Sequence, residues 1–325
     1  MINVLNKFNL VCKNSEYPIY APFLHSEGGI LYANNGTSFL KVNCKTEFEG
    51  NINFFNLYPA IKNLSYYTIE QKKNKLHITS DNFQTDLKML NRLEVPNILL
   101  PDIPFYTLSE DIIQYIKYAF NFTSPSGDNE YVYVSHNYIY GLSNNRLFLA
   151  NLDTGINTRF FISKDVLPFL IKDCQINIEN NNIFIKYSDL DGYSSIKVPQ
   201  IYESKLDTIK DYIQRTENGA FFLCDVSFIK DAISKVDHIF LNEKEKNISF
   251  ENKDNKLIIY ANSNINGVAS YEIESGIGEE FKLEIDSTLF NFVPLSYKVY
   301  VNLNNLDRVL LKDNNNKITF LSKGY

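Results

Sequence analysis

The sequence predicts an α+β fold made of three tandem domains, each with antiparallel sheet and two helices. Three observations lead to this prediction. Short runs with strand-like alternation fill most of the chain, a few segments have helical spacing instead, and the order of these elements recurs three times. The chain has 325 residues, enough for two or three domains of roughly 100–150 residues each.

Strand signals dominate the chain. Runs rich in Val, Ile, Tyr and Phe alternate with polar residues, as expected for strands with one buried face. Such runs occupy residues 38–42, 75–79, 146–150, 256–260 and 298–302, among others. Turn formers such as Asn34, Asn35 and Gly36 separate them, so consecutive strands are expected to pair antiparallel.

Fewer segments carry apolar residues at helical spacing. Residues 112–122 follow Ser109, whose hydroxyl suits the N-cap of a helix. Another helix is expected near residues 164–171 after the cap Ser163, and Pro168 inside it must make it short or bent. Further helical segments are 2–12, 57–64, 226–236 and 287–293, and residues 202–215 are expected to form a connecting turn of helix.

Repetition along the chain predicts the domain organisation. A strand, a short helix, a strand, a turn and a further strand follow one another from Ile52, from Phe160 and again from Phe281, so the offsets are 108 and 121 residues. Before each of these stretches, the chain has a helix followed by three or four strands. Proline and polar residues mark the joins. The sequence therefore predicts three domains, at residues 1–101, 102–214 and 215–325.

The composition argues against several classes of protein. Lys and Arg total 32 and Asp and Glu total 38, a net charge of −6, which argues against coating nucleic acid over the whole surface but leaves room for one local basic face. No apolar run approaches the roughly 20 residues of a membrane helix, and no secretory signal is recognisable, so a cytoplasmic protein without a membrane partner is expected. The four widely spaced cysteines fit a reduced setting in which each is a small buried hydrophobe.

Residues for catalysis are scarce. The four histidines are isolated and lack metal-ligand spacing, and none of the common phosphate-binding or nucleophile motifs occurs. Asp237 and His238 could be drawn with Cys224 as a nucleophile set, an interpretation that we do not favour. The turn at residues 189–192 lacks the later ligands of a calcium loop and is expected to be a hairpin turn. We therefore predict a protein that is not an enzyme and needs no cofactor and no metal.

In their order and spacing, these features resemble the bacterial-type DNA polymerase sliding clamp, the β subunit that serves as processivity factor. Residues 160–168 resemble the strand that leads into the inner helix of the family's second domain, and residues 142–147 stand in the place of its Thr-Asp-Gly-His-Arg-Leu type turn. Residues 93–97 and 278–286 resemble two further family segments, so the resemblance covers nearly the whole chain. Residues 319–325 replace the family's Met-Pro-Met-Arg-Leu type tail, a divergence that suits a phage-encoded clamp.

The resemblance implies a ring of six domains closed by a head-to-tail homodimer, with strands outside and helices lining the hole. Double-stranded DNA would be encircled without being read in sequence, a DNA polymerase would be tethered to it, and an ATP-dependent clamp loader would open the ring. Lysines of the helical segments are then predicted to face the DNA: Lys7, Lys13, Lys62, Lys117, Lys164, Lys172, Lys230 and Lys235.

The resemblance also implies a hydrophobic pocket between the middle and last domains, into which an extended partner peptide inserts apolar anchors. The residues that match it by position are Asn145, Arg146, Leu147, Asp286, Leu289, Phe320 and Leu321. For Arg146 and Leu147, the alternative is an ordinary strand after a turn.

Three other functions stay open on the sequence. A β-rich phage structural protein of a tail or baseplate would share the Tyr- and Asn-rich strands, but the paired helices of each repeat argue against it. An enzyme with a divergent site is a second alternative. A clamp-fold cofactor for transcription or repair would share the ring and differ only in its partners, so the sequence does not separate it from a replication clamp.

Overall fold

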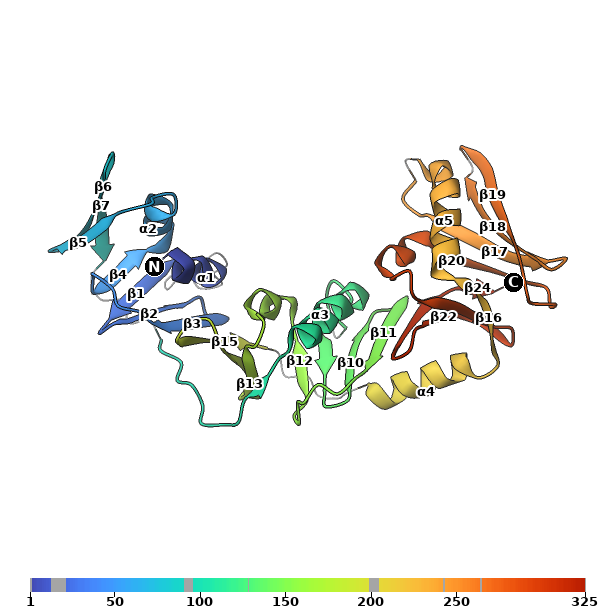
Figure 1. Ribbon diagram of the computed structural model, residues 1–325, viewed down its shortest axis with the longest axis horizontal. Coiled ribbons are helices and arrows are strands. Elements are labelled where there is room, and N and C mark those ends of the chain that lie inside the picture. The colour runs from blue at the N-terminus through green and yellow to red at the C-terminus, as the bar shows by residue number, and fades with distance from the viewer. Residues whose placement is uncertain are drawn as a thin grey trace. The chain divides into compact units, whose positions relative to one another are not determined.

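The computed structural model of the chain describes residues 2–12, 22–90, 96–127, 129–198, 205–241, 243–263 and 265–324. The chain forms two compact units, Met1–Gln114 with Ile162–Gln200 and Tyr115–Phe161 with Ile201–Tyr325 (Figure 1). Because this division falls inside the middle third of the chain, the two predicted boundaries between the three domains stay a prediction. In the described ranges, no helix combines the length and the apolar character that a membrane crossing requires.

Each third of the chain contains the same series of elements, a first half with a helix and three strands and a second half with a strand, a helix and three strands, and the middle and last thirds have additional strands. The first third contains α1 (Ile2–Cys12), β1 (Phe23–Glu27), β2 (Ile30–Asn34), β3 (Ser38–Asn43), β4 (Gly50–Asn53), α2 (Phe54–Ile61), β5 (Thr68–Lys72), β6 (Lys75–Ser80) and β7 (Phe83–Leu90). The middle third contains β8 (Tyr106–Thr107), α3 (Glu110–Ala119), the 3₁₀ helix η1 (Phe120–Phe122), β9 (Val132–Val134), β10 (Tyr138–Leu142), β11 (Arg146–Asn151), β12 (Phe160–Ile162), η2 (Lys164–Phe169), β13 (Gln175–Glu179), β14 (Asn182–Lys186) and β15 (Gly192–Lys197).

Helix α4 (Leu206–Glu217) leads into the last third. That third contains β16 (Ala220–Asp225), α5 (Val226–Val236), η3 (Asp237–Phe240), β17 (Asn247–Lys253), β18 (Lys256–Ser263), β19 (Gly267–Glu274), β20 (Phe281–Asp286), η4 (Ser287–Phe292), β21 (Lys298–Asn302), β22 (Asn305–Lys312), β23 (Asn316–Leu321) and β24 (Lys323–Gly324). The antiparallel α+β fold and the threefold repetition predicted from the sequence are confirmed.

The first unit contains one sheet of antiparallel strands in the order β5-β6-β7-β4-β1-β2-β3-β15-β14-β13-β8. Strand β3 of the first third pairs with β15 of the middle third, with Phe39 opposite Ser195. Helix α1 packs on β1, β2 and β3 and contacts α2, which packs on β4 and β7. Leu5 and Phe8 of α1 and Leu57 of α2 are fully buried, so these helices cover one face of the sheet.

The second unit contains two sheets, in the orders β12-β9-β10-β11-β23-β22-β21-β16 and β19-β18-β17-β20-β24. Strand β11 of the middle third pairs with β23 of the last third, with Leu147 opposite Thr319. Helix α5 packs on β16, β18 and β19. Aromatic rings join α3 to the strand pair, because the ring centroid of Phe148 lies 4.9 Å from that of Tyr118 and 5.4 Å from that of Phe122.

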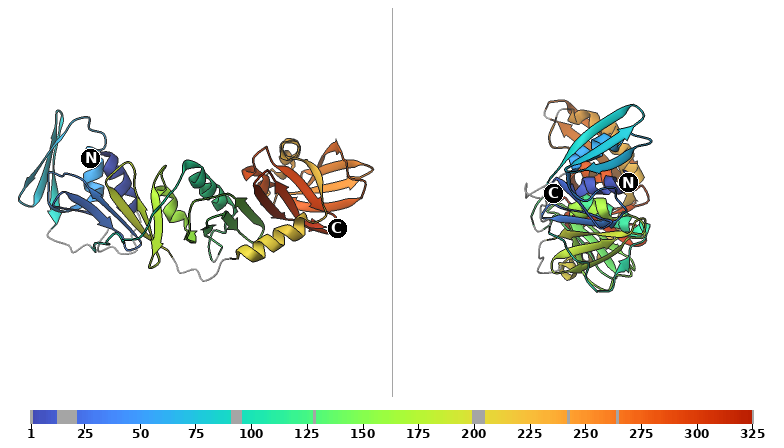
Figure 2. Two further views of the ribbon diagram at one scale, coloured as in Figure 1. Left: turned by 60° about the horizontal axis from the view of Figure 1, so that its bottom comes forward. Right: turned by 90° about the vertical axis from the view of Figure 1, so that its left-hand side faces the viewer.

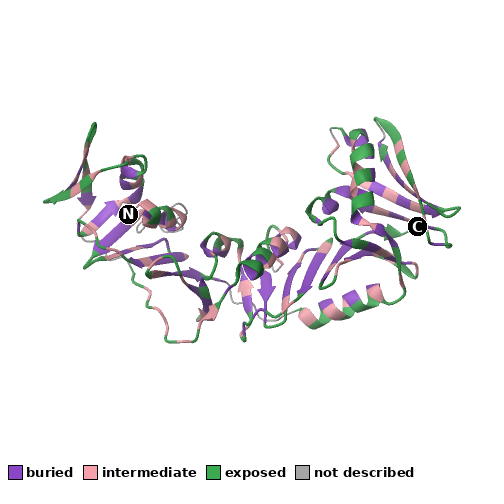
Figure 3. Cartoon of the chain, viewed as in Figure 1, coloured by how far each residue is buried: buried purple, intermediate pink, exposed green. Residues whose placement is uncertain are grey.

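Helix α4 lies on the other face of the eight-stranded sheet (Figures 1 and 2). Consecutive side chains of a strand point to opposite faces, so Phe148 faces α3 whereas Leu147 and Leu149 face α4. The apolar stripe of α4 covers them, and Figure 3 shows buried residues on this side of the helix. The cluster between helix and sheet consists of Tyr133, Tyr140, Leu147, Leu149, Ile209 and Ile213.

Polar contacts fix the C-terminal end of α4. The side-chain amide of Asn302 donates to the backbone carbonyl of Asn218 at 2.8 Å. Glu217 accepts from Lys312 at 3.0 Å through Oε1 and from Lys317 at 2.5 Å through Oε2. Partial burial opposes the charge of Glu217, but the two lysines outweigh it, so the pKa of Glu217 lies below its usual value. The helix predicted as a connecting turn is therefore an integral part of the second unit.

The segment 96–105 has the corresponding place in the first unit. It covers Phe39 and Tyr193, on the face of the β3–β15 pair opposite to α1. The hydroxyl of Tyr193 donates to the carbonyl of Ile98, and the side-chain amide of Asn34 donates to the carbonyl of Pro96 at 3.0 Å. Each connection between thirds thus seals the strand pair that joins them.

The predicted helix starts are right in part. Ser109 Oγ accepts the N–H of Ile112 at 3.3 Å, as expected of an N-cap. Ser163 makes no side-chain cap hydrogen bond, so that prediction is wrong, and the following segment is a 3₁₀ helix. Pro168 explains its brevity, because proline has no N–H to donate within a longer α-helix.

Two other helices differ in position or type from the prediction. Helix α2 begins at Phe54 rather than at residue 57, because the side chain of Asn53 accepts the N–H of Phe55 and caps the helix there. The segment 287–293 is the 3₁₀ helix η4, capped by Asp286. The spacing of apolar residues predicts that a helix packs on the sheet, but it does not show which polar side chain caps the first turn of that helix.

The cysteines match the prediction of small buried hydrophobes in three cases. Cys12, Cys174 and Cys224 are buried, Cys44 is half-buried, and all four are free thiols. Burial raises the pKa of Cys12 to about 12, so its thiol stays protonated and inert at neutral pH.

We expect Glu217→Gln to lower the free energy of unfolding by about 1 kcal/mol at pH 7, because it removes the charge that holds Lys312 and Lys317. A carboxylate with a lowered pKa stabilises the fold above its unfolded pKa of about 4.3, and this stability is lost as the pH falls through the lower folded value. The difference between the two proteins should therefore vanish in acid. Urea unfolding from pH 3 to pH 7 measures it, with the exposed Glu280→Gln as the matched control. A difference in the free energy of unfolding that stayed constant from pH 3 to pH 7 would contradict a stabilising role of the Glu217 carboxylate.

Candidate functional site

The lysines predicted to face DNA lie on one set of helices. Lys13 lies outside the described residues. The others are Lys7 on α1, Lys62 at the end of α2, Lys117 on α3, Lys164 in η2, Lys172 after η2, and Lys230 and Lys235 on α5. In the first unit α1 lies opposite the segment 96–105, and in the second unit α3 lies opposite α4. Within each unit, one face of the sheet thus carries lysine-bearing helices and the other face carries a connection.

The seven lysines differ in whether a neighbouring carboxylate pairs with their charge. Lys7 Nζ lies 2.8 Å from Asp189 Oδ1 and 4.1 Å from the ring centroid of Tyr187, so its charge is largely committed within the first unit. Lys235 is exposed but pairs with Asp231 at 2.6 Å. The exposed lysines that form no ion pair with another described residue include Lys117, Lys164 and Lys172. These three have the least committed charge.

The three segments predicted to form a partner pocket meet in the second unit. Arg146 begins β11 and lies opposite Phe320 of β23. The N–H of Leu321 donates to the carbonyl of Asn145 at 2.8 Å. The guanidinium of Arg146 lies 5.5 Å from the ring centroid of Phe292 in η4. The β11–β23 pair thus brings together side chains that are more than 140 positions apart in the sequence.

Arg146 has an unusual environment for a surface arginine. Burial lowers the pKa of its guanidinium, and the nearby charge of Asp286 opposes that shift. Its Nε is buried and has no hydrogen-bond partner in the described part of the chain. Asp286 itself is engaged, because its Oδ1 accepts the N–H of Thr288 at 2.9 Å. A buried donor without a partner costs free energy rather than stabilising the fold, so Arg146 is a candidate functional residue rather than a structural one.

Three of the seven predicted pocket residues lie in the core. Leu147 and Leu289 are 2% exposed and Phe320 is fully buried. Leu147 lies beneath α4, and the ring of Phe320 meets that of Phe290 edge-on at 5.5 Å. Leu321 is 44% exposed, so it offers an apolar side chain at the surface beside Asn145 and Arg146. The role of all seven residues in partner binding stays a prediction.

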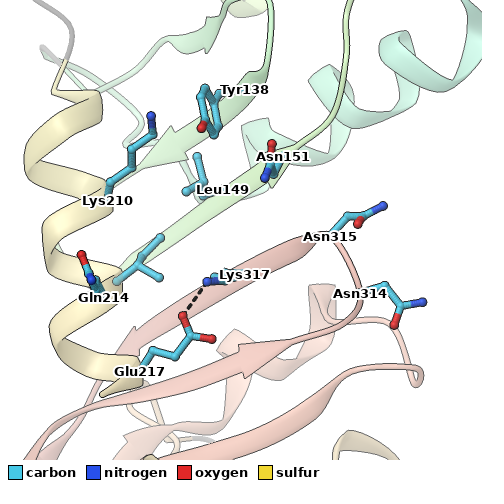
Figure 4. Close-up of a pocket in the computed structure, with 10 residues that line it drawn as sticks. Tyr138, Leu149, Asn151, Lys210, Gln214, Glu217, Asn314, Asn315 and Lys317 are labelled. Carbon is cyan, nitrogen blue, oxygen red and sulfur yellow. Dashed lines mark hydrogen bonds and ion pairs between the residues drawn. The ribbon is translucent and has the colours of Figure 1, made fainter. Parts of the chain in front are cut away.

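A pocket that the sequence did not predict opens beside α4 (Figure 4). Its volume is about 520 Å³. Figure 4 shows Tyr138 and Leu149 on the strands facing Lys210 and Gln214 on the helix. Lys210 Nζ lies 3.8 Å from the ring centroid of Tyr138. The spacing of the apolar residues in α4 signals a one-sided helix, but only the fold shows which sheet face it covers and what opening it leaves.

The candidate nucleophile set is not assembled. Asp237 is bound to Lys246 at 3.0 Å, and His238 Nδ1 lies 2.9 Å from the carbonyl oxygen of Lys235. Cys224 is buried, which raises the pKa of its thiol to about 12. Across the described ranges, no three His, Cys, Asp or Glu side chains are grouped so that they could hold a metal ion.

We expect Arg146→Met to change the free energy of unfolding by less than about 1 kcal/mol, because the buried Nε has no hydrogen-bond partner among the described residues and the apolar stem is kept. Leu147→Ala should instead lower it by about 3 kcal/mol, since it empties a buried site under α4. Urea unfolding of both variants measures the contrast. A large loss of stability for Arg146→Met would make this arginine a structural residue.

Comparisons with known proteins identify the fold. No protein-family model and no curated protein matches the sequence. Among solved structures, the DNA polymerase III β chain from Streptococcus pneumoniae has a TM-score of 0.81 at 13% identity, covering 99% of this chain and 97% of that one. The sliding clamp from Bacillus subtilis has a TM-score of 0.79 at 14% identity, with 99% and 96% covered.

A third solved structure is the Helicobacter pylori β clamp bound to a DNA ligase peptide. Its TM-score is 0.77 at 13% identity, and the match covers 99% of this chain and 97% of that one. The structural similarity extends over nearly the whole length of both chains, although their sequence identity is low. The chain therefore has the fold of the DNA polymerase III β subunit, the sliding clamp, as the sequence resemblance implied.

Proposed function

We propose that this chain is a DNA sliding clamp, which encircles duplex DNA and tethers a replicative DNA polymerase as its processivity factor, with no catalysis of its own. The observation that carries the proposal is the extent of the likeness, since the clamp fold runs through 99% of this chain and 97% of the Streptococcus pneumoniae β chain. An accessory tether needs topological linkage to DNA rather than tight binding, and a ring supplies it.

Repeat pairing supports a ring made of two copies. Strand β3 ends the first half of the first third, and it pairs with β15, which ends the second half of the middle third. In the same way β11 of the middle third pairs with β23 of the last third. By position in the repeat, β19 and β7 are the equivalent strands, and among the described strands neither has such a partner. Strand β19 is outermost in its sheet, and β7 pairs with β4 only through Met89 and Leu90. Pairing of β19 with β7 of a second copy would cover both edges in a head-to-tail homodimer.

The lysine-bearing helices supply the DNA-facing surface of this proposal. A mobile ring needs attraction to phosphates without contacts to base edges, and lysine supplies a point charge suited to that. Lys117, Lys164 and Lys172 carry the least committed charge, whereas the chain as a whole has a net charge of −6. The acidic remainder would keep DNA away from the outer surface.

Partner binding is proposed at the surface formed by Asn145, Arg146 and Leu321. The Helicobacter pylori β clamp was solved bound to a DNA ligase peptide, and we propose that this chain likewise binds an extended segment of a partner protein. In this chain α4 already covers Leu147, which leaves the Arg146 surface and the pocket beside α4 for a polymerase segment. An ATP-dependent loader is the remaining proposed partner, because a closed ring must be opened to receive circular DNA.

We expect a solution mass of about twice 37.6 kDa and retention on DNA that depends on topology. After loading on nicked circular plasmid with a clamp loader, the protein should stay bound through gel filtration. It should dissociate when the same complexes are cut once by a restriction enzyme, because a ring slides off an open end. Equal retention before and after cutting would rule out encirclement. A monomer or a large polymer would instead favour a structural role.

We expect the triple variant Lys117→Glu, Lys164→Glu and Lys172→Glu to shorten retention on circular plasmid and to flatten its dependence on salt. Each lost phosphate contact reduces the slope of log affinity against log salt by about 0.9. The matched control changes three exposed lysines away from the helices, Lys45→Glu, Lys197→Glu and Lys253→Glu, and has the same net charge. Equal effects of the two triples would show that total charge, rather than the helix face, governs retention.

A further inference from the structure

We infer that a second pocket of the second unit binds a nucleotide, with the phosphate at Lys298 and Lys312 and the base against the ring of Tyr300. The pocket is lined by residues of β21, β22, the turn at residues 313–316 and α3, and its volume is about 520 Å³. Small-molecule sites usually have volumes of about 300–1,000 Å³. The proposed clamp function does not use this pocket, so the inference goes beyond that function.

Three lysines lie side by side on adjacent strands of the eight-stranded sheet. Lys317 of β23 pairs with Lys312 of β22, and Lys312 in turn pairs with Lys298 of β21. Residues directly opposite each other in antiparallel strands have Cβ atoms about 4.5–5.5 Å apart, and like charges at that distance destabilise the sheet. A row of three lysines therefore lowers the stability of the sheet unless anions compensate their charge.

The protein compensates this row only in part. The carboxylate of Glu217 pairs with both Lys312 and Lys317, so it offsets one of the three charges. Lys298 is exposed and forms no ion pair with another described residue, although Asp225 lies opposite it on β16. A group of charges that weakens its own sheet indicates a functional site, and a bound anion would relieve the repulsion.

The lining of the pocket offers ammonium groups to an anion. Lys298 and Lys312 both line it, together with the carboxylate of Asp313. That carboxylate is committed to the turn, because its Oδ1 accepts the N–H of Asn316 at 2.9 Å and its Oδ2 accepts from the side-chain amide of Asn316 at 3.2 Å. The two ammonium groups are therefore the charged groups available to a ligand, and they suit a phosphate group.

Aromatic rings lie directly beside these lysines. Lys312 Nζ is 4.5 Å from the ring centroid of Tyr300, and Lys298 Nζ is 5.7 Å from that of Phe222. The two rings meet edge-on at 5.8 Å, and Phe222 is 49% exposed. Any nucleobase has a π face that stacks on an aromatic side chain, with cationic groups beside it for the phosphate. Rings and lysines together thus favour a nucleotide over a simple anion.

The turn at residues 313–316 separates this pocket from the one beside α4. Asn314 and Asn315 are exposed and line both pockets, and Figure 4 shows them on the side facing α4. Their carboxamides and the hydroxyl of Ser296 can donate and accept hydrogen bonds at the edge of a base or a ribose. The pocket beside α4 instead has Leu149 and Ile213 in its lining, which suits an apolar anchor of a protein segment. The two pockets therefore differ in the ligand that they favour.

Calorimetric titration of the full chain with ATP tests the site, with adenosine and inorganic triphosphate as partial ligands. ATP should bind with one equivalent per chain and more tightly than either partial ligand, because the site holds base and phosphate together. Lys298→Gln should weaken ATP binding about tenfold, through loss of a charge-assisted hydrogen bond. The matched control is Lys253→Gln, at an exposed lysine of β17. Absence of ATP binding, or an equal effect of the two variants, would overturn the inference.

A short single-stranded oligodeoxyadenylate separates the two possible sources of the nucleotide. A site for free nucleotides should prefer ATP, whereas a site for one unit of a single strand should prefer the oligonucleotide, and both preferences should depend on Lys298. Oligonucleotide binding that Lys298→Gln leaves intact, in a protein that does not bind ATP, would contradict the site.

The stability of Lys298→Gln gives an independent measurement. Urea unfolding should show a higher midpoint for this variant than for the wild type, because the substitution relieves the repulsion between Lys298 and Lys312. A lower midpoint would make Lys298 a structural residue and would overturn the argument that the row is kept for a ligand.

Tyr300→Trp reports on the position of the base, because the chain has no tryptophan of its own. Stacking of the base should quench the emission when ATP binds, whereas inorganic triphosphate should have little effect. Tyr66→Trp is the control, since Tyr66 is 81% exposed and belongs to the first unit. Unchanged emission of Tyr300→Trp with ATP bound would overturn the placement of the base. All of these measurements use protein without duplex DNA, so their failure would leave the proposed ring intact.

Discussion

Antiparallel pairing between the last strands of successive half-domains is the interaction on which this structure depends. Strand β3 needs β15 and β11 needs β23, because an unpaired strand edge leaves its N–H and C=O groups without partners. The pairing ties together halves that belong to different thirds of the chain. For this reason the compact units cut through the middle third instead of following the sequence repeat.

Each sheet that joins two thirds of the chain is covered by helices on one face and by a connecting segment on the other. On one face, helices fill the core with side chains such as Phe8 and Phe148, and their outer surfaces are free to carry lysines. On the other face, the connections between thirds seal the joint, with the segment 96–105 in the first unit and α4 in the second. A one-sided helix can replace an extended segment in this position because both need only one apolar stripe against the sheet.

The proposed partner surface and the proposed DNA-facing surface depend on different interactions. Arg146 gains little from its own fold, since its guanidinium is half-buried and its Nε finds no hydrogen-bond partner in the described part of the chain. The lysines on the helices are solvated charges whose pull on phosphate weakens with salt. One surface favours a defined contact and the other a diffuse attraction, a combination that suits a tether which holds a protein firmly and DNA loosely.

The sequence by itself determined the α+β class, the threefold repeat and most helices, because alternation and helical spacing are local consequences of burying one face. Through a family resemblance it also predicted that residues 145–147, 286, 289 and 320–321 form one partner-binding site, which stays a prediction. The tertiary structure decided the rest. Only strand pairing shows that Leu147, Leu289 and Phe320 are buried while Arg146 stays at the surface, and only packing shows that α4 covers Leu147. Burial depends on neighbours that are distant in sequence, which no local pattern encodes.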